Sequence, residues 1–131
     1  MKKFLLVLTA LIFTCSIAYG ATKQFGDNFK KVLEKYDGST SYIDTTTISQ
    51  TDDIVTFDMI IDYVNNKENV DYSEQTLVYN CATREWKLLR LIDHLNNGTV
   101  HRTPEGFLAK LPFQKASTSQ DVQAYFNYVC K

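Results

Sequence analysis

Hydrophobic and polar side chains alternate most clearly between Ile54 and Tyr63, where every second residue from Val55 onward is apolar or aromatic. A period of two is typical of a β-strand that buries one face. Two further strand-like runs follow, Asp71 to Cys81 and Trp86 to Leu95, with Ala82 to Glu85 as the turn between them. The middle of the chain therefore predicts three consecutive antiparallel strands.

Shorter segments flank these strands and are separated by turn-forming residues. Asp37-Gly38 precedes a short strand at Ser41 to Asp44, and Asn97-Gly98 leads into another at Thr99 to Thr103. Asn-Gly predicts a type I′ hairpin turn, because both central residues of that turn need positive φ. Phe29 to Tyr36 fits either a helical stripe or a strand, and both readings stay open.

The clearest helical period lies close to the C-terminus. Either Thr118 or Ser119 can cap a helix there, and Asp121 suits its first turn. The apolar positions recur at i, i+3, i+4 and i+7, namely Val122, Tyr125, Phe126 and Val129. The chain is expected to close with an amphipathic helix that ends at Cys130.

The turn before the Trp86 strand determines which side chains share a sheet face. If Thr83-Arg84 is its centre, one face carries Cys81, Tyr79, Leu77, Trp86, Leu88 and Ile92. The opposite face has apolar residues as well, Val78, Leu89 and Leu91. The residues after Gly106, a second subunit or a partner must cover that face.

The N-terminus has the three parts of a signal peptide. Lys2 and Lys3 precede the apolar run Phe4 to Ile12, and Ala18 and Gly20 occupy the two positions that a signal peptidase reads. The run is too short to cross a bilayer comfortably, since a spanning helix needs about 20 apolar residues. Residues 1–20 are therefore expected to be removed.

Cleavage would leave residues 21–131 as a single domain of an exported protein, whether periplasmic, on the cell surface or secreted. A lipid anchor on Cys15 is the lesser reading, because Phe13 and Thr14 fit poorly before a lipidated cysteine. Loss of the signal peptide also leaves an even number of cysteines.

The two remaining cysteines, Cys81 and Cys130, favour a disulfide in an oxidising compartment. Two free thiols are the alternative, but no Cys-x-x-Cys spacing supports a reactive one. Because bridged Cα atoms lie within about 7 Å, the bond would place the terminal helix over the Cys81 face. The expected fold class is α+β, with an antiparallel sheet of about five or six strands and the C-terminal helix packed on one face. A mixed sheet stays open.

Composition excludes several classes of function. The mature chain would have twelve Lys and Arg against fifteen Asp and Glu, a net charge of −3, with no basic run to hold nucleic acid. No second apolar stretch is long enough to span a membrane. The sequence has no glycine-rich phosphate loop and no nucleophile elbow, so neither a cofactor nor catalysis is expected.

His94 and His101 are the best candidates for a catalytic or metal-binding role. With Asn97-Gly98 at the centre of the hairpin they would face each other, and Asp93 would pair with Arg102 on the opposite face. Two imidazoles can bind Zn²⁺ or Cu²⁺, but a structural zinc site needs four ligands and a catalytic site three. A solvated polar pair is the preferred interpretation, and no metal is expected.

Arg84, Lys87, Arg90 and Arg102 form a loose basic cluster. These four are the candidate binding residues, although a solvated face is the default for such a cluster. Trp86 is typical of binding hot spots. In the predicted register it faces the helix, which favours a role in the core.

Four short segments follow one another in a recognisable order. They are Tyr42-Ile43-Asp44-Thr45, Asp53-Ile54-Val55-Thr56 running on to Asp62-Tyr63, Leu77-Val78-Tyr79-Asn80-Cys81-Ala82, and Tyr128-Val129-Cys130. With this order the chain resembles the surface-adhesin protein E family from about Phe29 to Cys130. The most specific part is Tyr-x-Cys-Ala followed by a charged turn and an apolar strand.

The resemblance implies a small exported bacterial protein with a largely antiparallel sheet, a packed C-terminal helix and the matching disulfide. The adhesin that names the family binds host extracellular-matrix proteins and epithelial surfaces. It is also lipid-anchored, and basic before its cysteine-bearing strand. Here Cys15 lacks a good lipidation context, and the corresponding region holds Glu68, Asp71 and Glu74.

The expected function is that of an exported, non-catalytic binding protein of the bacterial envelope or surface. Its partner would be a host matrix, cell-surface or envelope protein, recognised through an exposed sheet face. A periplasmic accessory or inhibitor protein acting within the envelope is the alternative. A homodimer stays open.

Overall fold

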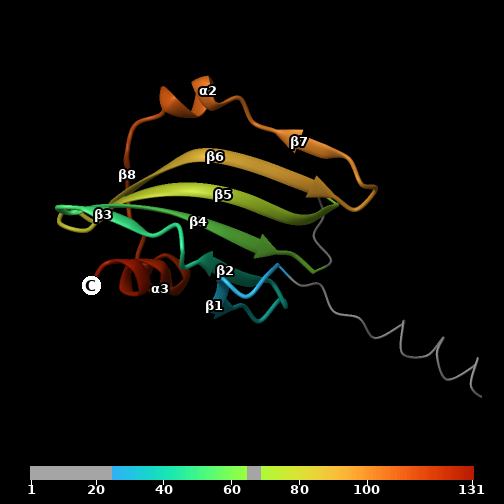
Figure 1. Ribbon diagram of the computed structural model, residues 1–131, viewed down its shortest axis with the longest axis horizontal. Coiled ribbons are helices and arrows are strands. Elements are labelled where there is room, and N and C mark those ends of the chain that lie inside the picture. The colour runs from blue at the N-terminus through green and yellow to red at the C-terminus, as the bar shows by residue number, and fades with distance from the viewer. Residues whose placement is uncertain (1–24, 65–68) are drawn as a thin grey trace, which may run out of the picture.

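Eight strands form one sheet in the computed structural model, which describes residues 25–64 and 69–131 (Figure 1). They are β1 (Phe29–Glu34), β2 (Thr40–Asp44), β3 (Ser49–Thr51), β4 (Ile54–Asp62), β5 (Val70–Asn80), β6 (Glu85–Leu95), β7 (Val100–Arg102) and β8 (Gln114–Lys115). Their order is β1-β2-β4-β5-β6-β7, with β3 also paired to β4 and β8 to β6. Every pairing in this described part is antiparallel, so the sheet is not mixed.

The expected signal peptide, residues 1–20 with Cys15, lies outside the described residues, as does Glu68. Cleavage after Gly20 therefore stays a prediction. Among the helices that the structure describes, none is long and apolar enough to cross a membrane.

One-sided burial explains the alternation of the central strands. Val55, Phe57 and Met59 of β4 point to the same face and are almost completely shielded from solvent. We call this the helix face, because the helix α3 (Gln120–Val129) packs on it. β1 occupies the segment for which two readings were open, and its strand geometry excludes the helical one.

α3 is attached to the helix face through its predicted apolar stripe. Phe126 is fully buried, and its ring stacks on Tyr79 with the centroids 4.2 Å apart. The hydroxyls of Ser41 and Tyr125 form a buried hydrogen bond of 2.6 Å. Ser119 stands at the N-cap, although its side chain makes no capping hydrogen bond. The predicted position of the helix is thus confirmed.

Cys81 and Cys130 form the predicted disulfide, with their Cα atoms 5.6 Å apart. Cys81 lies in the turn after β5, and Cys130 directly follows α3. The bond ties the end of the helix to one end of the sheet, and it excludes the alternative of two free thiols.

The turn between β5 and β6 has the predicted length of four residues but begins one residue earlier than predicted. It spans residues 81–84, because Asn80 pairs with Glu85, and it keeps Cys81 out of the strand. Trp86 therefore lies opposite Tyr79 rather than Cys81. The register error is two residues, and a shift of two keeps side chains on their predicted face.

A β-bulge at Leu89 shifts the register between β6 and β5. The side chains in the second half of β6 therefore lie on the faces opposite to those predicted. Ile92 was predicted on the helix face with Trp86. It instead lies opposite Glu74 on the other face, so that prediction was wrong. Leu91, predicted on the other face, turns to the helix face for the same reason.

The face opposite α3 is covered at both ends. The short helix α2 (Glu105–Ala109) lies beyond β6 (Figure 1), and its Leu108 is buried. At the other end, the Phe25 ring packs against Tyr42 and Tyr72, with centroid distances of 5.6 and 5.2 Å. The residues after Gly106 thus supply part of the cover that this face was expected to need.

Candidate functional site

Three of the four predicted binding residues share the face opposite α3. Lys87, Arg90 and Arg102 reach it because their strand partners, Val78, Thr76 and Ile92, lie on that face.

Arg84, the fourth predicted residue, is separated from the other three. Its guanidinium lies 4.6 Å from the centre of the Phe126 ring and donates a hydrogen bond to Gln123 of α3. Arg84 therefore supports the docking of the helix rather than a joint basic surface.

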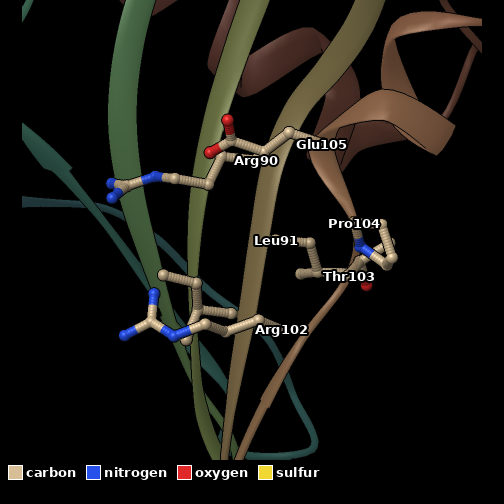
Figure 2. Close-up of a pocket in the computed structure, with 7 residues that line it drawn as sticks. Arg90, Leu91, Arg102, Thr103, Pro104 and Glu105 are labelled. Carbon is tan, nitrogen blue, oxygen red and sulfur yellow. The ribbon is translucent and has the colours of Figure 1, made fainter.

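Arg90 and Arg102 line a cavity of about 260 Å³ at the edge of the sheet (Figure 2). Their guanidinium groups extend in the same direction across the neighbouring strands. The remaining lining comes from the second half of β6, from the segment after β7 and from the first residue of α2, namely Leu91, Ile92, Thr103, Pro104 and Glu105. The lining of the cavity thus includes two arginines, one glutamate and several apolar side chains.

The two arginines differ in how much of their charge is compensated. Arg90 donates to the Thr76 hydroxyl at 3.1 Å and lies 3.7 Å from a carboxylate oxygen of Asp58. Thr76 in turn donates to Asp58 at 2.6 Å, so this network fixes the Arg90 side chain. Arg102 is exposed and forms no ion pair among the described residues. Arg102 is therefore the cation best placed to bind an acidic group, and a planar guanidinium suits a carboxylate.

His94 and His101 do not face each other as predicted. The loop between β6 and β7 spans residues 96–98, since the Leu95 N–H donates to the Thr99 carbonyl at 2.8 Å. Within this loop Gly98 alone has positive φ, 87°, so the turn is not type I′. His101 consequently lies opposite Asp93, one residue out of the predicted register.

The surroundings of His94 are those of a packed polar side chain. Its ring stacks on Tyr72 with centroids 4.1 Å apart, and Nε2 lies 2.6 Å from a Glu74 carboxylate oxygen. Because His94 lies opposite Val100, His101 and His94 belong to opposite faces. No group of three or more possible metal ligands occurs among the described residues.

A small apolar groove of about 120 Å³ runs between α3 and the sheet. Its lining includes Met59, Leu77, Tyr79, Trp86, Val122 and Tyr125. Trp86 is only partly buried and packs against the core, in line with its predicted core role. Burial raises the pKa of the Tyr79 phenol far above its ordinary value, with a smaller contribution from Tyr125. The groove holds no charged side chain.

Sequence reasoning missed a group of exposed apolar side chains around α2. Phe107, Leu111 and Phe113 come from this segment, and Leu89 from the strand beneath it. The run Gly106 to Phe113 is mostly apolar and follows a proline, which was the available signal.

Comparisons with known proteins agree with this architecture. The family model described as surface-adhesin protein E matches residues 29–131. A structure of Haemophilus influenzae protein E aligns with a TM-score of 0.55 at 16% identity, covering 85% of this chain and 89% of that chain. A second crystal form gives 0.57 at 14% identity, covering 83% and 91%. At such identities these structures support the fold alone. A search of the curated proteins found no match.

Proposed function

Because the chain belongs to the surface-adhesin protein E family, we propose that it is an exported, non-catalytic binding protein that recognises a host matrix or cell-surface protein. The single observation that carries the proposal is the family match over residues 29–131. Membership of this family implies an exported surface protein. The sheet with its docked helix then acts as a rigid scaffold for a binding surface.

The cavity beside Arg102 is the best placed contact surface for such a partner. Arginine and aromatic side chains dominate protein–protein hot spots. Arg102 is exposed, and Arg90 is fixed beside it by Thr76 and Asp58. An acidic side chain of the partner would enter the cavity and bind Arg102.

The test is binding of the purified, disulfide-bonded protein to a panel of purified extracellular-matrix proteins and to epithelial cells. We expect saturable binding to at least one of them, and a loss of about tenfold or more for Arg102→Ala, because a hydrogen bond to a charged group contributes about 1.5–3 kcal/mol. Lys30→Ala is the control, since Lys30 is an exposed cation on β1 at the opposite edge of the sheet. Absence of binding across the panel would contradict the proposal.

Protease treatment of intact cells tests the location. Degradation of the protein on intact cells supports surface exposure and the adhesin-like role. Protection until the outer envelope is permeabilised would instead favour the alternative of a periplasmic accessory or inhibitor protein.

A further inference from the structure

Four exposed apolar side chains belong to the α2 segment and to β6, the strand that α2 packs against. The exposed fractions are 36% for Leu89, 59% for Phe107, 37% for Leu111 and 42% for Phe113. We call this group the α2 cap. In Figure 1, α2 is the outermost element beyond β6, on the far side of the sheet from α3.

Backbone and side-chain contacts tie the residues that follow Phe107 to β6. The Leu111 N–H donates to the Leu108 carbonyl at 3.1 Å, so the helical turn continues beyond Ala109. Lys87 Nζ donates to the Ala109 carbonyl at 2.8 Å and lies 6.0 Å from the centre of the Phe113 ring. Leu108 is buried, which anchors α2 while Phe107 points outward.

Basic residues are concentrated at this edge of the molecule. Residues 84–115 contain six Lys and Arg but three Asp and Glu, whereas residues 21–83 and 116–131 together contain six Lys and Arg and twelve Asp and Glu. Arg84 packs on α3 rather than near the cap, so the net charge is +2 for residues 85–115 and −5 for the remainder of residues 21–131. Lys110 and Lys115 belong to the α2 segment, and Lys87 lies beneath it. Such a separation of charge turns the basic side toward an anionic surface.

We propose that the α2 cap docks on the surface of an anionic phospholipid bilayer. Phe107, Leu111 and Phe113 enter the boundary between headgroups and acyl chains, and the lysines contact lipid phosphates. Phe and Leu with flanking Lys are typical of interfacial membrane contacts, whereas lysine is depleted from the cores of protein interfaces. The acidic remainder of the molecule faces away from the bilayer. The four apolar residues of the cap do not line the Arg102 cavity, although Glu105 of α2 does, and their docking does not depend on a protein partner.

Cosedimentation with vesicles tests the proposal on the purified, disulfide-bonded protein. We expect binding to vesicles of 30% phosphatidylglycerol in phosphatidylethanolamine, and little binding to pure phosphatidylcholine. Phe107→Ser should lower the partition coefficient about tenfold. Lys110→Gln should lower it about fivefold, because a lysine near an anionic surface contributes about that factor. High salt should weaken the wild-type binding.

Tyr36→Ser is the matched control, because Tyr36 is fully exposed near β1 at the opposite edge of the sheet. Its partition coefficient should equal that of the wild type, and circular dichroism should show that each variant is folded. Absence of binding to the anionic vesicles, or binding that Phe107→Ser leaves unchanged, overturns the proposal. A dimer in light scattering that Phe107→Ser converts to a monomer also overturns it, because a second copy would then cover the cap. Failure of the matrix-protein assay leaves these vesicle results unaffected.

Discussion

Removal of the disulfide is the sharpest test of how the terminal helix is held. The bond joins Cys81 to Cys130 across a sequence separation of 49 residues. The perturbation is the double variant Cys81→Ala/Cys130→Ala, compared with the oxidised and the chemically reduced wild type. Other attachments of α3 remain in the variant, including the buried Phe126 ring and the hydrogen bond of Tyr125 to Ser41.

The expected loss of stability follows from the length of the closed loop. Closing a 49-residue loop in the unfolded chain contributes about 4 kcal/mol in the chain-entropy model. Domains of this size are stable by about 5–15 kcal/mol, so the variant should fold but with a reduced margin. The corresponding fall in Tm is roughly 15–30 °C, at about 4–8 °C for each kcal/mol.

Urea unfolding followed by the fluorescence of Trp86, the single tryptophan, measures this loss. The reduced wild type keeps both sulfur atoms, so agreement between it and the double variant assigns the effect to the crosslink rather than to sulfur packing. Native-state fluorescence should not change, because α3 stays docked. A loss below about 1 kcal/mol would refute the loop-entropy reasoning. Loss of helical circular dichroism in the native state would show that packing alone cannot hold α3.

Two further predictions concern backbone conformation and alkaline pH. Gly98 has φ of 87° and open space around its Cβ position, so Gly98→Ala should cost about 1 kcal/mol through the backbone alone. Gly106 also has open space but lies in α2, so Gly106→Ala should instead stabilise the protein by about 0.5–1 kcal/mol. Urea unfolding that shows both variants stabilised, or both destabilised, would contradict this. Burial raises the pKa of Tyr79 in the folded state, so its contribution to stability is complete below the unfolded pKa of about 10 and is lost as pH rises above it. Stability measured from pH 9 to 11 should fall less steeply in Tyr79→Phe, and an unchanged slope would show that another group controls alkaline unfolding.

The sequence predicted those elements whose burial is one-sided. β4 could be recognised because Val55, Phe57 and Met59 alternate with less buried residues. α3 could be recognised because its buried residues Tyr125, Phe126 and Val129 recur at helical spacing. In both elements the pattern is a direct consequence of packing against one face. The family resemblance rests on parts of β2, β4, β5 and α3 and agrees with the family match.

Register was harder to predict, because it depends on single residues in turns and bulges. Residues 87–92 read Lys-Leu-Leu-Arg-Leu-Ile, so no alternation marks Leu89 as the bulge. Asn97-Gly98 is compatible both with a two-residue type I′ turn and with a three-residue loop that needs positive φ at the glycine alone. The structure has the second, which moves His101 out of reach of His94. Arg84 does not lie with the other three residues of the predicted basic cluster, because it belongs to the turn before β6 and packs on α3.

The edges of the sheet limit how this molecule can recognise a partner. A long, flat edge strand invites pairing with another chain, but β1 carries Lys30, Lys31 and a bulge, all of which discourage such pairing. At the opposite edge, β7 and β8 pair with the two ends of β6, and α2 lies between them. Main-chain pairing with a partner is therefore disfavoured at both edges. Recognition is left to side chains that project from the β6 side, where the exposed Arg102 and the α2 cap lie.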